Sequence, residues 1–268
     1  MGRAFAVVVI VITLVSAYFF AAHTWWPPAG ASSHAAALDE QFKSTFLEAG
    51  LAFVLSQILL ACFVWKYRDK GDGAKPKLFP GGAKGPVLTA FILVGLELLG
   101  LELMGSKVWA QLYYQQPPAD AVKVYVSAEQ FAYYFRYPGP DGKFGAIHPD
   151  KIDVGTGNFF GLDKENEPDA RDDIVTATLA IPVNRPVELI LHAKDVNHSF
   201  YVPEMRIQQD FVPGIEIPIH FTPTKIGDYL IVCTQLCGLG HYKMHGMVHV
   251  VSQEDFDKWL AAREAEKQ

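Results

Sequence analysis

Cysteine is scarce in this sequence: the 268 residues contain three, Cys62, Cys233 and Cys237. Three cysteines are too few for a small fold held together by disulfides. The haem-attachment pattern C-x-x-C-H is missing, which excludes a covalently bound haem of the c type on this chain. Internal repeats and a glycine-rich phosphate loop are missing as well, so repeat proteins and P-loop nucleotide-binding proteins are excluded.

Positive charge is also in short supply toward the C-terminus. Residues 118–268 hold 14 Lys and Arg against 22 Asp and Glu, a net charge of 14 − 22 = −8. A surface of this sign argues against binding to nucleic acid and suits a neutral or basic protein partner.

Charge is nearly absent from three long apolar runs. Residues 4–22 have no charged side chain, residues 46–65 have only Glu48, and residues 85–104 have only Glu97 and Glu102. A helix needs about 20 apolar residues to cross the hydrocarbon core of a bilayer, so each run is predicted to span a membrane. Cys62, inside the second run, is expected to be a small buried side chain.

The distribution of basic residues predicts the orientation in the membrane. The loop 66–84 carries six Lys and Arg against two Asp, which places it in the cytoplasm. The chain after the third run then lies outside, on the periplasmic face of a bacterial-type cell membrane. We expect residues 1–25 to form a first transmembrane helix and residues 26–117 a helical hairpin; a cleaved signal peptide is the alternative for residues 1–25.

Glu97 and Glu102 are carboxyl groups at membrane depth. Such groups are costly in lipid and indicate either a proton path or protonated side chains that face neighbouring helices and hydrogen-bond there. Both interpretations require neighbouring helices, so we expect partner subunits in the membrane.

The pattern changes to short β-type runs in residues 118–252. The run 123–137 and six later ones are rich in Val, Ile, Tyr and Phe and are broken by Pro, Gly, Asn and Asp, which is typical of a β-sandwich or barrel. The acidic stretch 160–173 is predicted to be a loop. Residues 253–268 are predicted to form a helix with Ser252 as its N-cap.

Four soft or borderline metal ligands occur within twelve residues of the C-terminal part, between two predicted strands. The stretch CTQLCGLGHYKM contains Cys233, Cys237, His241 and Met244. Sulfur ligands favour copper, zinc or iron–sulfur clusters, and imidazole suits zinc or copper. Two thiolates can bridge two copper ions, each with one imidazole and one weak ligand, so the set favours a copper pair.

A copper pair requires a second imidazole. His198 is the best placed, at the head of a β run, whereas His192, His245 and His249 are interpreted as ordinary strand residues. Three alternatives remain for the cysteine loop: a zinc site, which Met244 fits poorly; a disulfide; and a mononuclear blue-copper site, for which one cysteine is superfluous.

Taken together, these segments resemble subunit II of haem–copper cytochrome c oxidases. The resemblance rests on the helical hairpin, on EQFAYYFRYPGPDGKFG, on DVNHSFYVPEMRIQQDFVPG and on CTQLCGLGHYKM. It implies a membrane-anchored all-β protein, in which N-terminal transmembrane helices precede a cupredoxin-like Greek-key β-barrel.

The resemblance also implies roles for individual residues. Cys233 and Cys237 would bridge two copper ions, and His198 and His241 would be terminal ligands. Met244 and the backbone carbonyl of Gln235 would be weak axial ligands. The family usually has Glu where this chain has Gln235, and its carboxylate helps to hold magnesium at the subunit interface, so magnesium is in doubt here. Phe131, beside Tyr133, stands where many members have the Trp through which electrons enter.

The implied function is that of the electron-accepting subunit of a cytochrome c oxidase. Cytochrome c would reduce the copper pair, which would reduce haem in a separate catalytic subunit that converts oxygen to water and moves protons. The intact ligand set argues against a quinol-oxidase subunit II. The chain is too short for a nitrous oxide reductase, and a copper-carrying assembly protein would more commonly hold a single ion.

Overall fold

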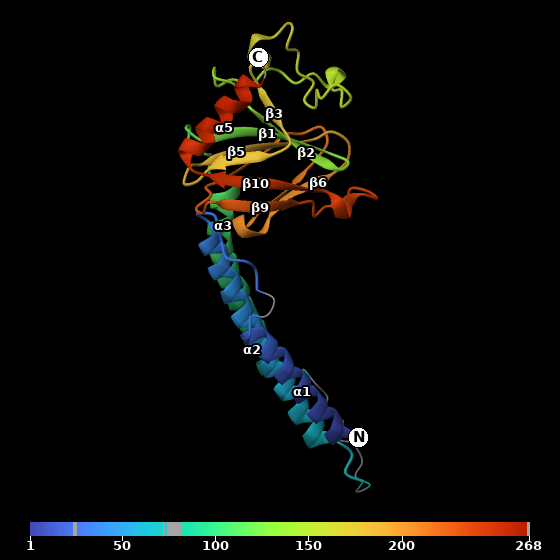
Figure 1. Cartoon of the computed structure of the whole chain (residues 1–268). Coiled ribbons are helices and arrows are strands. Elements are labelled where there is room, and N and C mark those ends of the chain that lie inside the picture. Colours follow the sequence, from blue (N-terminus) through green and yellow to red (C-terminus); the bar gives the residue numbers. More distant parts are fainter. Residues whose placement is uncertain (24–25, 72, 74–81, 267–268) are drawn as a thin grey trace. The chain divides into compact units, whose positions relative to one another are not determined.

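The computed structural model describes residues 1–23, 26–71, 73 and 82–266 and divides into two compact units (Figure 1). One unit comprises residues 1–27 and 37–107 and is helical, and the other comprises residues 28–36 and 108–268 and holds every strand found in the described residues. Part of the predicted basic loop 66–84, namely residues 72 and 74–81, lies outside the described residues.

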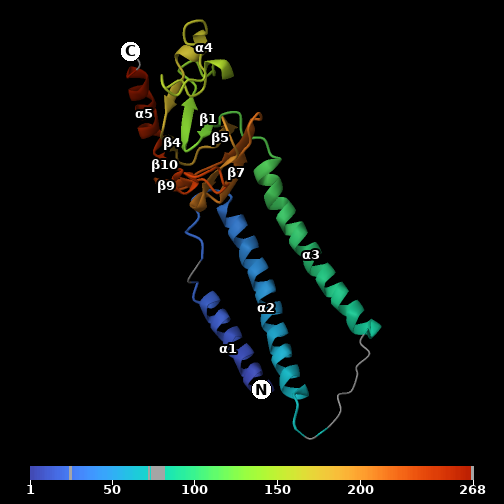
Figure 2. The same ribbon diagram turned by 90° about the vertical axis from the view of Figure 1, so that its right-hand side faces the viewer.

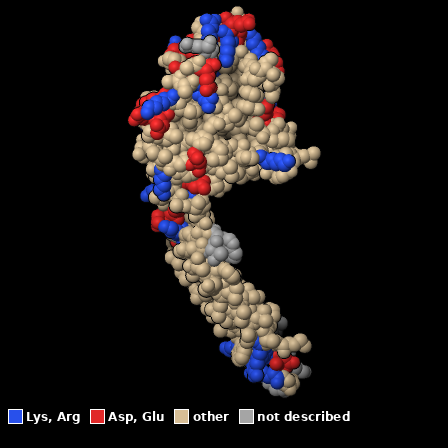
Figure 3. Space-filling model, in the orientation of Figure 1, with Lys and Arg blue, Asp and Glu red and all other residues tan. Residues whose placement is uncertain are grey.

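Among the described residues, three helices are long and apolar enough to cross a membrane: α1 (Gly2–Ala21), α2 (Ala35–Tyr67) and α3 (Lys84–Tyr113) (Figure 2). They agree with the three predicted spans, but α2 and α3 are longer. The additional turns contain Ala, Leu, Glu, Gln and Lys, which are good helix formers, so the helices continue beyond the apolar runs. Figure 3 shows that the visible flank of this unit carries its charged atoms near its two ends.

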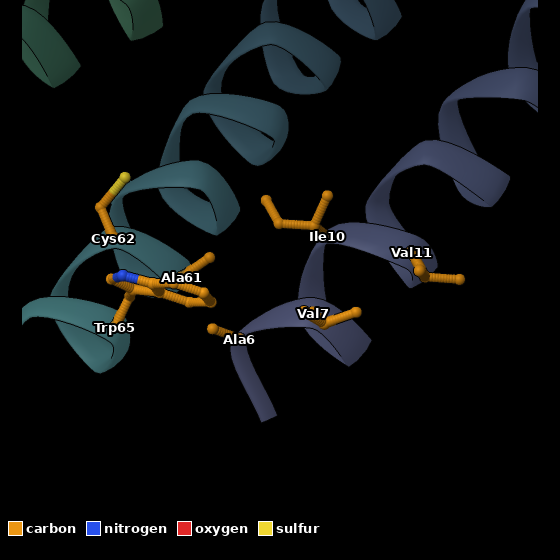
Figure 4. A pocket seen from close by; sticks show the side chains of 7 residues that line it. All are labelled: Ala6, Val7, Ile10, Val11, Ala61, Cys62 and Trp65. Carbon is orange, nitrogen blue, oxygen red and sulfur yellow. The ribbon is translucent and has the colours of Figure 1, made fainter. Parts of the chain in front are cut away.

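α1 and α2 lie side by side and leave an apolar hollow between them (Figure 4). Seven residues line the hollow: Ala6, Val7, Ile10, Val11, Ala61, Cys62 and Trp65. Ala6 and Ala61 are buried, but Cys62 is exposed on the helix surface. The prediction that Cys62 is a small buried side chain was therefore wrong for this chain by itself, because the outer faces of membrane helices contact lipid or partner subunits rather than a core.

The strands form two five-stranded sheets that face each other across the core. One sheet has the order β3-β2-β1-β5-β8 and the other β4-β10-β9-β6-β7. Most neighbours are antiparallel, but β1 pairs with β5 and β4 with β10 in parallel. The strand bounds are as follows: β1 Val122–Glu129, β2 Ala132–Tyr137, β3 Ile174–Thr176, β4 Leu179–Pro182, β5 Val187–Ala193, β6 His198–Val202, β7 Ile207–Phe211, β8 Ile217–Phe221, β9 Gly227–Val232 and β10 His245–Val251.

Alternating burial along the strands defines the core between the sheets. β5 alternates strictly between buried and half-buried side chains, as a strand with one core face does. Leu189, Leu191, Phe200, Phe211 and Val248 are fully buried in that core. The predicted cupredoxin-like, membrane-anchored β architecture is thus confirmed.

Two segments of the β unit show more detail than the sequence pattern predicted. The β-type run 123–137 forms a hairpin, because Glu129 pairs with Ala132 and leaves Gln130 and Phe131 as a two-residue turn. The acidic stretch 160–173 contains a short helix, α4 (Pro168–Arg171), with Pro168 at its first position, where proline is favoured.

The remaining short elements connect the strands. They are the 3₁₀ turns η1 (Pro149–Lys151), η2 (Pro203–Met205) and η3 (His241–Lys243). The C-terminal helix α5 (Gln253–Ala265) begins as predicted, with the Ser252 hydroxyl accepting a hydrogen bond from the backbone N–H of Asp255.

Residues 28–36, which lead into the first turn of α2, form a strap across the β unit. The N–H of Ala31 donates to the carbonyl of Glu204 at 2.6 Å, and the N–H of Thr224 donates back to the carbonyl of Ala31 at 2.8 Å. The hydroxyl of Ser32 is buried and donates to the carbonyl of Met205 at 2.7 Å. The strap therefore joins the turn after β6 to the turn after β8.

Candidate metal centre

The loop between β9 and β10 is fixed at both ends by the strand ladder. Val232 pairs with His245, and one step further the N–H of Cys233 donates to the carbonyl of Met244 at 3.3 Å. The chain between these two residues must therefore return on itself at the end of the sheet. This return brings Cys233, Cys237, His241 and Met244 together.

The two thiols lie at the centre of the cluster, with a different neighbour on each. The sulfur atoms of Cys233 and Cys237 are 3.8 Å apart, and both thiols are free. The backbone oxygen of Gln235 lies 3.1 Å from Cys233 Sγ. His241 Nδ1 lies 3.5 Å, and Met244 Sδ 3.8 Å, from Cys237 Sγ. The structure thus brings five of the predicted ligands into one cluster.

His198 reaches the same cluster from β6, which pairs with β9. One of its ring nitrogens lies within 4.8 Å of both cysteine sulfurs. Nε2 hydrogen-bonds to Asp195 Oδ1 at 2.8 Å, while Nδ1 is buried without a hydrogen-bond partner among the described residues. Burying an imidazole nitrogen without a hydrogen-bond partner costs free energy. Coordination of a metal ion by Nδ1 would remove this cost.

The protonation chemistry of the thiols also fits a cation. Burial, and next the proximity of Cys233, raise the pKa of the Cys237 thiol to about 11. At neutral pH this thiol keeps its proton unless a nearby positive charge stabilises the thiolate, as a bound metal ion does. The donors are sulfur, imidazole and one carbonyl, without a carboxylate, so they fit a soft or borderline metal rather than calcium or magnesium.

Asp195 connects His198 to the turn between β1 and β2. Its Oδ2 accepts from the N–H of Gln130 at 2.8 Å and its Oδ1 accepts from the N–H of Val196 at 2.7 Å. Burial alone would raise the pKa of Asp195, but these hydrogen bonds and the one from His198 outweigh it and lower the pKa. Asp195 is therefore a stable anion that orients the imidazole of His198.

The same turn contacts the cysteine loop directly. Gln130 Nε2 donates to the carbonyl of Cys237 at 2.6 Å, and the ring of Phe131 lies against Gly240, where an added Cβ would come within 2.4 Å of Cδ2. Gly238 has a φ of +132°, and an added Cβ there would lie 2.8 Å from Gln130 Nε2. Sequence reasoning missed Asp195 and Gln130 as supporting residues.

The two residues predicted to admit electrons lie in different surroundings. Phe131 is 38% exposed at the tip of the turn. Tyr133 is buried in the core, and its hydroxyl donates to the carbonyl of Ser199 at 2.7 Å. Of this pair, only Phe131 is accessible to another molecule.

Other sequence candidates lie away from the cluster. His192 is on β5, and His249 is on β10, where its Nδ1 hydrogen-bonds to Asp228 Oδ1 at 2.6 Å. Glu97 and Glu102 are exposed on α3 and have no hydrogen-bond or ion-pair partner within the described part of the chain. Within the β unit, neither His192 nor His249 belongs to the cluster of His198, Cys233 and Cys237.

These features define a membrane-anchored, cupredoxin-like domain with a candidate site for a soft metal at one end of its sandwich. The family model for the periplasmic domain of cytochrome c oxidase subunit II matches residues 123–251. The alternative cytochrome c oxidase subunit 2 of Bradyrhizobium diazoefficiens is 31% identical over 227 residues, which cover 83% of this chain and 79% of the relative. The chain belongs to the cytochrome c oxidase subunit II family.

A second relative agrees with this assignment. The cytochrome c oxidase subunit 2 of Cereibacter sphaeroides is 30% identical over 217 residues, which cover 78% of this chain and 69% of the relative. The crystal structure of the periplasmic domain of cytochrome oxidase subunit II from Bradyrhizobium japonicum aligns with 57% of this chain at 23% identity, with a TM-score of 0.42. The protein is a cytochrome c oxidase component, anchored by its N-terminal helices with its C-terminal domain in the periplasm.

Proposed function

We propose that this chain holds a dinuclear copper centre, accepts electrons there from a cytochrome c, and passes them to haem in a separate catalytic subunit. Cys233 and Cys237 are the bridging ligands in this proposal. His198, His241, Met244 and the backbone carbonyl of Gln235 are the others. The observation that carries it is the pair of thiols 3.8 Å apart, each next to a different additional donor.

The number and distribution of donors favour two ions over one. A structural zinc ion is coordinated by four strong ligands, so it would leave the thioether and the carbonyl without a role. Here Gln235 O lies beside Cys233, whereas His241 and Met244 lie beside Cys237. A mononuclear blue-copper site would leave one of the two thiols without a role.

The chain's own residues control the surroundings of the site. The copper pair, when bound, supplies a centre that gains and loses one electron. Asp195 orients His198, and the buried side chains of Cys233, Cys237 and Met244 keep water away from the ligands. Fixed ligands reduce the rearrangement that accompanies electron transfer, which is the protein's contribution to the rate.

The transmembrane helices supply the attachment to the rest of the oxidase. α3 is apolar and exposed, and it carries Glu97 and Glu102 without partners in the described part of this chain. Carboxyl groups at this depth need partners on other helices. We infer that α3 packs against the haem-bearing subunit, where the two carboxyls hydrogen-bond or take part in proton movement.

Spectroscopy of the full-length protein in detergent tests the copper pair. After copper loading, we expect an EPR spectrum in which one unpaired electron is shared by two copper nuclei, together with a purple colour. Cys237→Ser should abolish this spectrum, while Met244→Leu should alter the reduction potential and keep the pair. Cys62→Ser is the matched control, because Cys62 lies on α2, and it should change nothing.

Two results would contradict the proposal. A blue spectrum from a single copper nucleus would mean a mononuclear site. Stoichiometric binding of colourless zinc with no copper uptake would mean a structural site.

A further inference from the structure

Two arginines from different helices lie around one indole ring at the end of the helical unit. The guanidinium carbon of Arg3, in the first turn of α1, is 5.6 Å from the centre of the Trp65 ring. That of Arg68, just after the end of α2, is 5.4 Å from the same ring, and its guanidinium also donates to the backbone carbonyl of Trp65. Two positive charges are thus held near each other, which costs free energy unless an anion lies close to both.

The ends of α1 and α2 pack closely, and this packing fixes the place of both arginines. A Cβ added to Gly2 would lie 2.7 Å from the Cβ of Arg68. Ala6 of α1 and Ala61 of α2 are buried where the two helices meet. Small side chains let helix backbones approach closely, as is usual between membrane helices. The two guanidinium groups therefore belong to one surface, although they come from different helices.

The surface around the two arginines is strongly basic. Residues 1–3 and 65–71 hold four Lys and Arg against one Asp, a formal charge of 4 − 1 = +3. The acidic residue, Asp69, accepts a hydrogen bond from the backbone of the following turn at 2.8 Å. Within the described part of the chain, neither Arg3 nor Arg68 forms an ion pair with a carboxylate. Figure 3 shows basic atoms gathered at this end of the helical unit.

The apolar hollow between α1 and α2 begins at the same indole. Trp65 is one of the seven residues that line the hollow, and its ring extends from α2 toward α1 (Figure 4). The hollow has a volume of about 370 Å³, within the range of roughly 300–1,000 Å³ that is usual for ligand sites. None of the seven lining side chains is charged. A ligand that contacts both the arginines and the hollow needs an anionic end and an apolar tail.

The hollow extends over most of one bilayer leaflet. Arg3 and Val11, the last residue of α1 that lines the hollow, are 11 − 3 = 8 residues apart. Eight residues span about 12 Å of helix, and half of the hydrocarbon core is about 15 Å thick. Because the C-terminal domain is periplasmic and follows α3, the end of α2 at Arg68 lies at the cytoplasmic surface. The hollow therefore faces the cytoplasmic leaflet.

We propose that the paired ends of α1 and α2 form a binding site for one anionic phospholipid of the cytoplasmic leaflet. The lipid phosphate lies between Arg3 and Arg68, whose planar guanidinium groups donate paired hydrogen bonds to phosphate oxygens. One acyl chain lies in the hollow against Trp65. Binding makes and breaks no covalent bond, and it holds α1 against α2. The lipid site is independent of the proposed copper centre.

A phospholipid fits this surface better than a transmembrane helix of a partner subunit. Close contact between membrane helices requires small side chains, but Val7, Val11 and Trp65 are large and exposed along the hollow. A partner helix would also have to place carboxylates beside the two arginines. A phospholipid supplies the anion at the membrane surface and the apolar chain below it. Basic pockets between helices on the cytoplasmic side are typical sites for anionic headgroups.

The test measures which lipid stays bound to the full-length protein. An equal mixture of phosphatidylglycerol and phosphatidylcholine is added to the protein in a non-ionic detergent, and native mass spectrometry counts the bound lipids. The wild type should retain one phosphatidylglycerol in preference to phosphatidylcholine. Arg3→Gln and Arg68→Gln should each lower this preference about fivefold, the factor that one basic side chain contributes near anionic lipid. Arg68→Lys should keep more of it than Arg68→Gln. Lys43→Gln is the matched control, since Lys43 lies toward the other end of α2, and it should change nothing.

Filling the hollow tests the acyl chain separately from the headgroup. Val7→Phe places a larger side chain in the hollow and should lower the retention of phosphatidylglycerol. Val8→Phe is the control, because Val8 is 52% and Val7 53% exposed on the same helix, but Val8 does not line the hollow. Glycerol phosphate carries the anion without acyl chains, so at a concentration equal to that of the lipid it should displace none.

Several results would overturn the lipid site. They are equal retention of both lipids by the wild type, equal preferences in Arg68→Gln and Lys43→Gln, equal retention in Val7→Phe and Val8→Phe, and displacement of the lipid by glycerol phosphate. An intact mass showing that the purified protein lacks residues 1–21 would also overturn it, because the hollow requires α1.

Discussion

Asp195 Oδ1 accepts a hydrogen bond from His198 Nε2 at 2.8 Å, and this single contact leaves Nδ1 of the imidazole as the nitrogen available to a metal. The other oxygen of Asp195 accepts from the backbone of Gln130, which in turn contacts the carbonyl of Cys237. Asp195 is not a proposed ligand, but its hydrogen bonds connect the β1–β2 hairpin to His198 and, through Gln130, to the loop that contains Cys237.

Replacing Asp195 should weaken metal binding without removing a ligand. Loss of a supporting carboxylate typically costs a metal site about 10- to 100-fold in affinity, because the imidazole loses its fixed orientation and tautomer. We expect Asp195→Ala to fall in this range in a copper competition titration of the full-length protein. Asp228→Ala is a close control, since Asp228 also contacts a histidine, His249, but away from the cysteine loop. Equal affinities in the two variants would show that Asp195 does not orient the site.

Gly240→Ala should destabilise the β unit through Phe131. The backbone of Gly240, with φ near −91°, suits any residue, but its added Cβ would lie 2.4 Å from the Phe131 ring. We expect a cost of about 1–3 kcal/mol, typical of overpacking, and a lower thermal midpoint of unfolding. The double variant Gly240→Ala, Phe131→Ala should recover part of this loss. Gly155→Ala, where the Cβ meets only Asp153 Oδ1 at 3.2 Å, is the control. Additive effects in the double variant would contradict a direct contact.

The sequence predicted the cysteine loop and His198 because both signals are local. Cys233, Cys237, His241 and Met244 lie within twelve residues between two recognisable strands, and His198 heads a β run. The apolar runs predicted the helices for the same reason, since twenty successive residues carry the signal.

The supporting residues could not be predicted in this way. Gln130 meets Cys237 across 107 positions of sequence and Asp195 across 65, and a glutamine and an aspartate near a turn are common in any loop. The hairpin turn at Gln130 and Phe131 was hidden because both flanking strands are aromatic and read as one continuous run. Only the pairing of β1 with β2, which is a tertiary contact, distinguishes a hairpin from one continuous strand here.

Arg136 and Asp173 form a fully buried ion pair that should be essential for stability. Arg136 Nε donates to Asp173 Oδ2 at 2.9 Å, and its guanidinium lies 5.1 Å from the centre of the Phe144 ring. Removing one partner leaves an uncompensated buried charge, which costs about 3–5 kcal/mol. We expect Asp173→Leu to lower the free energy of unfolding by this amount in a denaturant titration.

Two further variants test whether the loss of stability in Asp173→Leu comes from the unpaired buried charge. Arg136→Met combined with Asp173→Leu should recover part of the loss, because an apolar pair has no charge to desolvate. Lys123→Met should cost less than about 1 kcal/mol, since the Lys123–Glu188 pair is 3.4 Å long and its lysine is 52% exposed. If Asp173→Leu cost no more than Lys123→Met, the buried pair would not be a stabilising element.

Ser32 should hold the strap of residues 28–36 on the β unit. Its buried hydroxyl donates to the carbonyl of Met205, whereas the neighbouring Ser33 is exposed. Ser32→Ala leaves that carbonyl without this donor, at a cost of about 1 kcal/mol, while Ser33→Ala should be neutral. Hydrogen exchange with mass spectrometry is the direct measurement, because the amides of Ala31, Ser33 and Thr224 are bonded only while the strap is docked. Ser32→Ala should speed their exchange about fivefold, the factor that 1 kcal/mol gives for a local opening, and leave β9 unaffected. Equal exchange in the two serine variants would mean that the backbone hydrogen bonds alone hold the strap in place.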